Sequence, residues 1–236
     1  MPELWQEASP AIQAFGLSPG SAAFAGYNGP VANLPAPNTV PVGYYARVTD
    51  LGVGGTSEWV SDGTIWRPRG GSVLLYQRLG SVASPVATIN GNGTNVNFVI
   101  PDVCLIPPQV LYPGIRVYAA AKFRRTALAA GAVASASRVC LGSSGHPVND
   151  LSMLATTLSA TLNQEHAAMG YADVVSNTVY KSQNYVIWNG ISVAGFFDRT
   201  VFFNTTGNTY VTFGCTSTLI AGDVLALLDY TVRLEG

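Results

Sequence analysis

Residue types that commonly catalyse reactions or bind metals are sparse and widely spaced in this sequence. His146 and His166 are the two histidines, and neither belongs to an HExxH or HxH pattern that would bring two metal ligands together. The segment 142–145 (Gly-Ser-Ser-Gly) differs from the GxSxG pattern of a nucleophile elbow, and no strand-to-helix transition follows it. We therefore predict no metal ion, no cofactor and a solvated turn at residues 142–145.

Carboxylate pairs are the other route to hydrolysis. Asp173, Asp198 and Asp223 could converge in space, but nothing in the sequence selects a pair. The three cysteines lie in apolar contexts and lack CxxC spacing, which predicts buried thiols. They are Cys104, Cys140 and Cys215. We expect that the chain is not an enzyme.

The charge content of the chain is low. Charged residues make up 11% of the sequence, against about 25% in soluble domains, and the formal net charge is -1. Without clustered Lys and Arg, the chain lacks the contacts that release counterions from nucleic acid, so nucleic acid is excluded as the main partner. The hydrophobic content of 48% is ample for a core. Because Lys122 and Lys181 are the only lysines, we expect much of the surface to contact other protein.

The N-terminal sequence lacks the features of a targeting signal. Residues 1–7 include two acids and no base, so the positive region of a signal peptide is missing. No uninterrupted apolar run approaches the roughly 18 residues of a membrane span. We expect a protein that is made in a cytoplasm and does not insert into a membrane.

Residues 1–40 are predicted to form an extended arm. Small residues alternate with isolated bulky side chains, and the one helical signal is at Ser9-Pro10, where Ser9 fits an N-cap. Too little apolar surface recurs for this segment to fold alone, so it either lies in a groove of a neighbouring subunit or is disordered. The candidate anchoring residues are Leu4, Trp5, Phe15 and Leu17.

Residues 41–80 are predicted to form a small β-meander. Strands are expected at 43–50, 58–60 and 65–68, and Asp62-Gly63 is a hairpin signal because glycine tolerates a positive φ. About forty residues bury too little apolar area to be stable alone, which predicts an oligomeric collar. The candidate trimer-interface residues are Tyr44, Tyr45, Trp59 and Trp66.

Residues 81–236 are predicted to form a β-sandwich with a jelly-roll-like arrangement. Apolar residues alternate along 115–124 and 223–234, which is the period of a strand. Roughly eight to ten strands at near-regular spacing, with no long amphipathic helix, are typical of such a sandwich. The other expected strands are 96–100, 153–162, 172–180, 185–188, 196–204 and 208–215, and 127–137 is either helical or a loop.

Charge and aromatic residues suggest two surfaces in this third region. Between residues 116 and 138 there are five bases and no acid, while residues 139–236 hold seven acids and three bases. The bases are Arg116, Lys122, Arg124, Arg125 and Arg138. They form either a solvated strand face, a patch that meets acids across a subunit interface, or a site for an acidic saccharide. The candidate surface-recognition residues are Tyr180, Tyr185 and Trp188, each of which has core burial as the alternative.

Three stretches of the sequence resemble tailed-bacteriophage virion proteins, especially tail fibres and head fibres. They are 34–52 (Leu-Pro-Ala-Pro to Asp-Leu-Gly) and 61–68 (Ser-Asp-Gly-Thr-Ile-Trp-Arg-Pro), which are similar to a small β module, and 93–235, which is similar to a C-terminal β-sandwich. The resemblance covers about residues 34–236. It implies a homotrimer that is anchored to the particle by its N-terminal arm, with a distal sandwich.

Two functions follow from this resemblance. In the first, the chain is a tail fibre whose sandwich attaches to a host-surface saccharide or protein. In the second, it is a head fibre, decoration or cement protein that stabilises the capsid. The arm would bind other virion proteins of the tail, baseplate or capsid, and the location would be the virion. No catalytic motif of a depolymerising tailspike is present.

Overall fold

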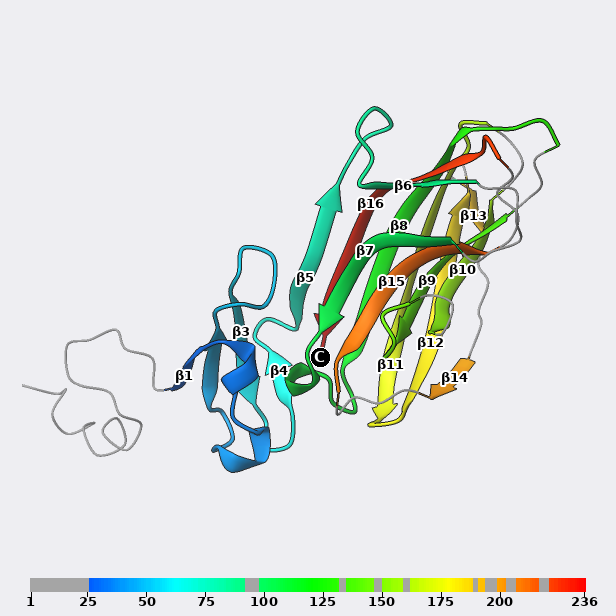
Figure 1. Cartoon of the computed structure of the whole chain (residues 1–236). Coiled ribbons are helices and arrows are strands. Elements are labelled where there is room, and N and C mark those ends of the chain that lie inside the picture. Colours follow the sequence, from blue (N-terminus) through cyan, green and yellow to red (C-terminus); the bar gives the residue numbers. More distant parts are fainter. Residues whose placement is uncertain are drawn as a thin grey trace, which may run out of the picture.

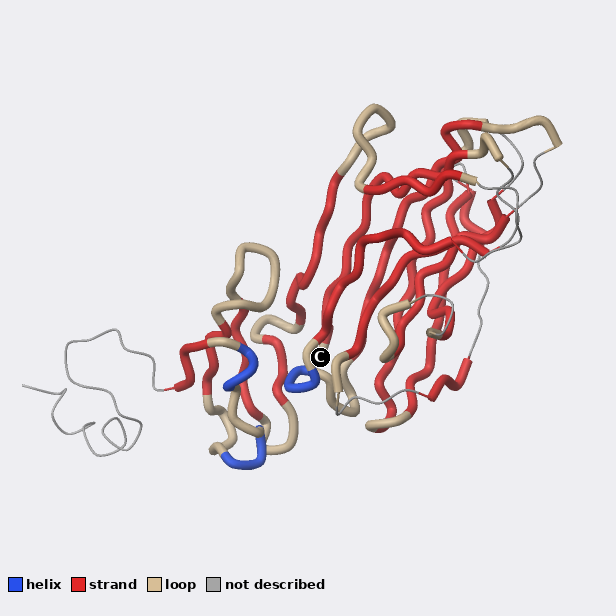
Figure 2. Tube along the Cα trace, in the orientation of Figure 1, coloured by secondary structure: helices blue, strands red, loops and turns tan. Residues whose placement is uncertain are grey.

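Strands dominate the computed structural model of this chain. The structure describes residues 26–91, 98–131, 135–146, 150–158, 162–188, 191–193, 199–202, 207–216 and 221–236. In these segments the helices are three single 3-10 turns, η1 (Val31–Asn33), η2 (Pro37–Thr39) and η3 (Pro108–Val110), as Figure 2 shows. None of these helices is long and apolar enough to cross a membrane. The prediction of an all-β fold is confirmed.

A four-stranded sheet forms the N-terminal module. Strands β2 (Tyr45–Val48), β3 (Ser57–Ser61) and β4 (Trp66–Pro68) form the predicted antiparallel meander. Strand β1 (Gly26–Gly29) adds to β2 in parallel, which the sequence did not reveal. Trp59 and Trp66 are fully buried, and the indole N–H of Trp66 donates to Pro35 O at 2.9 Å.

The turn between β3 and β4 is the hairpin connection predicted at Asp62-Gly63. Gly63 has a φ of +90°, in the region that glycine adopts without steric cost. The carboxylate oxygen Oδ1 of Asp62 accepts from the backbone N–H of Thr64 at 2.9 Å and of Ile65 at 2.8 Å. Hydrogen bonds from backbone N–H groups to a nearby Asp side chain stabilise a turn without help from distant residues. The Asp62-Gly63 pair was therefore enough to predict this turn.

Two sheets face each other in the rest of the chain (Figure 1). The four-stranded sheet has the order β10-β9-β15-β7, and the larger sheet has the order β13-β12-β11-β8-β16-β5, with β14 beside β12 and β6 beside β16. The strands of the smaller sheet are β7 (Phe98–Ile106), β9 (Ser135–Gly142), β10 (Leu151–Leu158) and β15 (Thr209–Thr216). Those of the larger sheet are β5 (Ser72–Leu79), β6 (Ala87–Asn90), β8 (Arg116–Ala127), β11 (Glu165–Ser176), β12 (Val179–Trp188), β13 (Ile191–Val193), β14 (Arg199–Phe202) and β16 (Val224–Glu235).

Eight of these strands have the connectivity of a jelly roll. The order β6-β16-β8-β11 in one sheet faces β7-β15-β9-β10 in the other, as two interleaved Greek keys require. Strands β5 and β6 both pair with β16, on the side away from β8. At the other end of the sheet, β12 pairs with β11, and β13 and β14 pair with β12. The rings of Phe213 and Tyr230 meet between the sheets with centroids 4.5 Å apart.

The alternation predicted for residues 115–124 is confirmed, while that for 223–234 changes phase. In β8, Val117, Ala119, Ala121 and Phe123 are buried and the residues between them are partly exposed. In β16, a bulge between Leu227 and Asp229 shifts the register against β8. Before the bulge Leu225 and Leu227 therefore belong to the main core cluster. Ala226 and Leu228, which were predicted to face the core with Val224, are buried but lie outside this cluster, and Val224 is partly exposed.

Two other element boundaries differ from the prediction. Residues 172–180 were expected to be one strand, but a turn at Asn177-Thr178 separates β11 from β12. The alanine-rich segment 127–137 contains the end of β8 and the start of β9, and its described residues contain no helix. Asn177 is of a residue type that favours turns. Because β11 and β12 pair antiparallel, the chain must reverse between them, and it does so at Asn177-Thr178.

The module and the sandwich share one hydrophobic core. A single cluster of contacting buried residues extends from Leu34, Trp59 and Trp66 in the module to Phe213 and Leu234 in the sandwich. Backbone hydrogen bonds also join the two parts, from Val53 N to Leu74 O at 2.9 Å and from Gly236 N to Gly71 O at 3.1 Å. Gly52 is required at this junction, because it has a φ of +106° and a Cβ there would lie 3.1 Å from Leu74 O.

This shared core corrects the predicted boundaries and interface. Residues 26–40, assigned to the arm, belong to the module, and residues 72–79, assigned to the meander, form β5 of the larger sheet. Trp59 and Trp66 are buried within one chain, so the prediction that they form a trimer interface is wrong. The module does not need a second copy to cover its tryptophans, since the sandwich extends its core. Tyr44 and Tyr45 are partly exposed, and the predicted anchors Leu4, Trp5, Phe15 and Leu17 lie outside the described residues.

One histidine lies in the interior of the sandwich. His166 in β11 is fully buried, opposite Phe123 of β8 in the strand register. Arg125, two residues along β8, is also fully buried. Burial and, to a smaller extent, the nearby charge of Arg125 together lower the pKa of His166 from 6.5 to about 4. His166 is therefore neutral in the folded chain at pH 7.

Truncation of Trp66 tests the shared core. We expect Trp66→Ala to lower the free energy of unfolding by about 3 to 5 kcal/mol, because it leaves a cavity and frees Pro35 O. The measurement is urea denaturation followed by circular dichroism. Val42→Ala is the control, since Val42 is 75% exposed. A variant as stable as the parent chain would contradict the assignment of Trp66 to the core.

The buried histidine predicts an acid sensitivity. The unfolded chain binds a proton at His166 below about pH 6.5 and the folded chain does so only near pH 4, so stability decreases as the pH falls through this window. The expected loss at pH 4 is about 3 kcal/mol. The measurement is the free energy of unfolding against pH for the parent, His166→Gln and His146→Gln. A slope that His166→Gln leaves unchanged would disprove the account.

Candidate functional site

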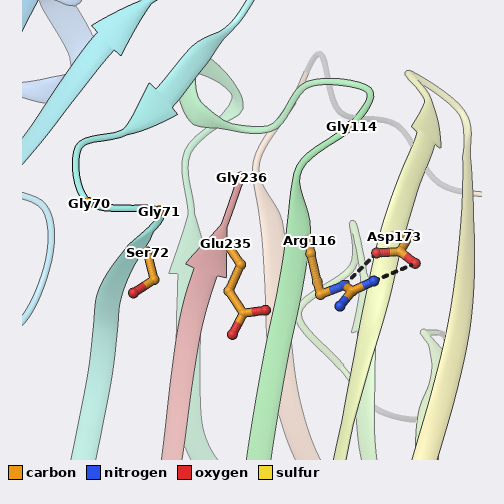
Figure 3. A pocket seen from close by; sticks show the side chains of 8 residues that line it. All are labelled: Gly70, Gly71, Ser72, Gly114, Arg116, Asp173, Glu235 and Gly236. Carbon is orange, nitrogen blue, oxygen red and sulfur yellow. Dashed lines mark hydrogen bonds and ion pairs between the residues drawn. The ribbon is translucent and has the colours of Figure 1, made fainter.

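A row of polar side chains crosses the outer face of the larger sheet at its end nearest the module. Asp173 of β11 is opposite Arg116 of β8, Arg116 is opposite Glu235 of β16, and Glu235 is opposite Ser72 of β5. The order Ser72–Glu235–Arg116–Asp173 is called the polar row below. With neighbouring strands about 4.8 Å apart, it spans about 14 Å. Figure 3 shows these side chains on the four adjacent strands.

The polar row forms the floor of an open pocket. The pocket has a volume of about 500 Å³ and is lined by the four residues of the row together with Gly70, Gly71, Gly114 and Gly236. The first two of these glycines connect β4 to β5, and Gly114 precedes β8. The pocket therefore lies at the junction of module and sandwich, where the shared core holds both parts in place.

Arg116 is held by two interactions. Its Nε donates to Oδ1 of Asp173 at 2.6 Å and its Nη2 donates to Oδ2 at 3.2 Å, which is a bidentate ion pair. The guanidinium carbon also lies 3.7 Å from the ring centroid of Tyr171. The hydrogen bond to Asp173 raises the pKa of Arg116 above its usual value. The guanidinium is thus charged and fixed in orientation at any physiological pH.

A second arginine–tyrosine stack lies beside the first. Arg233 of β16 has its guanidinium carbon 4.1 Å from the ring centroid of Tyr118, and its Nε donates to Glu235 Oε1 at 2.6 Å. Tyr118 is opposite Tyr171 in the pairing of β8 with β11. The two tyrosines therefore support two arginines, and each arginine bonds one carboxylate of the polar row.

A second charged group lies farther along the same face. Glu165 of β11 accepts from Lys122 Nζ at 2.7 Å and from Arg124 Nη1 at 2.9 Å. Hydrogen bonding from Lys122 is the largest effect that lowers the pKa of Glu165, and it outweighs the opposing effect of burial. Asp229 of β16 is opposite Lys122 in register, and burial raises the pKa of Asp229. The polar row is the stronger candidate site, because a pocket lies over it.

These pairs show where the bases of the segment 116–138 lie in the single chain. Arg116, Lys122 and Arg124 bond acids of the neighbouring strand β11 in the same chain, and Arg125 is buried in the core. These bases are therefore paired within the chain on the strand face, and the hypothesis that they meet acids across a subunit interface stays a prediction. Linear sequence could not reveal the pairing, because the bases and their acids are 41 to 57 residues apart.

The predicted recognition residues are placed differently. Tyr180 is fully buried and its hydroxyl donates to Leu141 O in the facing sheet at 3.3 Å, so the prediction that it forms a recognition surface is wrong. The side chains of Tyr185 and Trp188 lie outside the described residues. Among the described side chains, Tyr118 and Tyr171 are tyrosines that lie on the outer face of the larger sheet. Tyr118 could have been found from its spacing, because it alternates in phase with Arg116 along β8.

The other candidates for chemistry are separate in space. Asp173 is in the polar row, whereas Asp223 is buried at the far end of the sheet and accepts from Ala129 N at 2.8 Å. Asp198 lies outside the described residues.

The turn predicted at 142–145 is present, and Ser144 Oγ donates to the buried Asp150 at 2.8 Å. Cys104 and Cys140 are buried, as predicted, and the side chain of Cys215 is not described. Among the described residues, no three His, Cys, Asp or Glu side chains are grouped to hold a metal ion.

Comparisons with known proteins give no family for the chain. No family model matches the sequence, and no curated protein matches it. Similar solved structures include peanut lectin with a 9-residue peptide, at 9% identity and a TM-score of 0.34, covering 69% of this chain and 97% of the lectin. Another is a protein of unknown function from Shewanella oneidensis MR-1, at 11% identity and a TM-score of 0.33, covering 100% of this chain and 96% of that one. These likenesses are too weak to bear on function.

Proposed function

We propose that this chain is a structural protein of a tailed-bacteriophage virion, a fibre whose sandwich attaches to the host surface. The residues before the module would anchor it to other virion proteins, and three copies would assemble as a homotrimer. The proposal gives the chain no catalytic role. The sequence resemblance over residues 34–236 supports the virion assignment.

One observation supports attachment over a purely cementing role. The polar pocket is open to solvent on the outer face of the larger sheet, and its floor combines carboxylates, a guanidinium and a hydroxyl. Convergent polar groups in a concave site are typical of ligand recognition, whereas a flat apolar base under the sandwich would favour a cement protein. The exposed large apolar side chains among the described residues come from several strands and loops, with Val103 and Leu105 together on β7; the others are Val42, Val53, Leu79, Val82, Leu128, Leu162 and Val175.

Rigid coupling of module and sandwich is consistent with a fibre. A sandwich that shares its core with the module cannot swing freely about residues 70–72, so it would project from the particle in one orientation. Three copies held in this way would present three pockets together. Linked weak sites bind a surface far more strongly than a single site, because the second contact is intramolecular.

The proposal is tested on particles and cells. Gold-labelled antibody against this chain is applied to virus particles released by cells that produce it, and the purified full chain is mixed with the same bacterial strain. We expect label at the tail of the particle and sedimentation of the chain with the cells. Heat-denatured chain is the control for non-specific adhesion.

Two results would contradict the proposal. Label over the head, with no binding of the chain to cells, would instead support the decoration or cement function. Absence of label from all particles would remove the virion assignment altogether.

A further inference from the structure

We propose that the outer face of the larger sheet pairs with the same face of a second copy of this chain, through a row of four charged side chains. The contact has a twofold axis and depends on exposed ion pairs, which are individually weak. It goes beyond the proposed function, because it is a property of the chain alone and requires neither a virion nor a host.

Lys181 extends the polar row by one strand. It lies on β12 opposite Asp173 of β11, it is exposed, and the ion pairs of the described residues do not include it. The charged row, Lys181–Asp173–Arg116–Glu235, therefore alternates in sign across four adjacent strands. Directly opposite residues of antiparallel strands point to the same face of a sheet, so the four side chains share the outer face.

The alternation makes the charged row complementary to its own reverse. A twofold axis between Asp173 and Arg116, perpendicular to the sheet, places the row of a second copy over this one in the opposite direction. Lys181 then faces Glu235 of the second copy, and Asp173 faces Arg116 of the second copy. Each ion pair occurs twice about the axis, so every charge of the row meets an opposite charge. Without Lys181 the row would be negative, positive and negative, and its reverse would bring like charges together.

The groups of the charged row have hydrogen-bonding capacity to spare. Arg116 donates to Asp173 from Nε and Nη2, and its Nη1 takes no part in that pair. Glu235 accepts from Arg233 at Oε1, and its Oε2 takes no part in that bond. The ammonium of Lys181 supplies three donors. Each group can therefore bond the second copy and keep the partner that it has within the chain.

Arg116 and Glu235 are held in position before a second copy arrives. The guanidinium carbon of Arg116 lies 3.7 Å from the ring centroid of Tyr171. Glu235 is bonded by Arg233, whose guanidinium carbon lies 4.1 Å from the ring centroid of Tyr118. Side chains that are already fixed lose little conformational freedom on association, which lowers the cost of the contact. The exposed lysine is the member of the row that pairing must order.

Glycine leaves the rim of the pocket open to a second face. A Cβ added to Gly70, Gly71 or Gly114 would meet no atom within 4 Å, so no side chain projects from these positions and the space around them is free. Figure 3 shows the three glycines beside the row. A second sheet can therefore approach the charged side chains closely enough to pair with them.

The twofold contact is distinct from the proposed trimer and competes with the proposed attachment. Chains of one trimer are related by a threefold axis, so an isologous contact joins chains of two different trimers. The second copy lies over the pocket that contains Arg116, Asp173 and Glu235. A paired chain therefore does not present this pocket to a host surface.

The first test measures association of the full chain against concentration and salt. Sedimentation velocity is run from about 10 µM to about 1 mM chain, in about 50 mM and about 500 mM NaCl. We expect the species of dilute solution to double its mass with a dissociation constant on the order of 100 µM at the lower salt. Pairing should be about tenfold weaker at the higher salt, because salt screens exposed charges. No doubling at low salt, or doubling that salt does not weaken, would overturn the proposal.

Charge reversals locate the pairing on the charged row. Lys181→Glu and Glu235→Lys each bring like charges together at both ends of the row, so each variant alone should pair at least about tenfold more weakly than the parent. An equimolar mixture of the two variants should regain pairing, because each then meets the opposite charge on the other at both ends. Arg78→Glu is the matched control, since Arg78 is an exposed base of β5 outside the row.

The mixture separates a specific contact from damage to the fold. Thermal melting checks that each variant is folded, and Lys181→Glu alters an exposed side chain that forms no ion pair among the described residues. Folded variants that pair as strongly as the parent would overturn the proposal. A mixture that pairs no better than either variant alone would overturn it as well.

Discussion

Burial of Trp59 and Trp66 in a core that continues into the sandwich is the constraint on which the rest of the structure depends. A module of four short strands buries too little apolar area to be stable alone, and it gains the missing area from the sandwich. The same contact fixes residues 70–72 against the end of β16 through the hydrogen bond from Gly236 to Gly71. Gly70, Gly71 and Gly236, which line the pocket, lie at this junction.

The low charge content has a specific consequence on the outer face of the larger sheet. The few charged residues on β8, β11 and β16 are placed opposite one another in register, so most of them pair within the chain. Exposed pairs of this kind add little stability, since water screens them. Their effect is to fix the positions of hydrogen-bonding groups on this face.

Local patterns in the sequence predicted local structure well. The meander, the turn at Asp62-Gly63, the strand at 115–124 and the buried Cys104 and Cys140 depend on residues close in sequence. The parallel pairing of β1, the bulge in β16 and the ion pair of Arg116 with Asp173 depend on residues far apart, which periodicity cannot specify. Tyr180 and the two tryptophans were misplaced for a related reason, because an aromatic in a strand suits a core or a surface equally well until its neighbours are known.

Native-state hydrogen exchange tests the shared core most directly. If module and sandwich are one cooperative unit, the amides of Trp59 in β3 and Val232 in β16 exchange through global unfolding with the same opening free energy and the same dependence on denaturant. Exchange of Trp59 at a markedly lower free energy than Val232 would mean that the module opens independently. The junction and its pocket would then lack the rigid support that this account gives them.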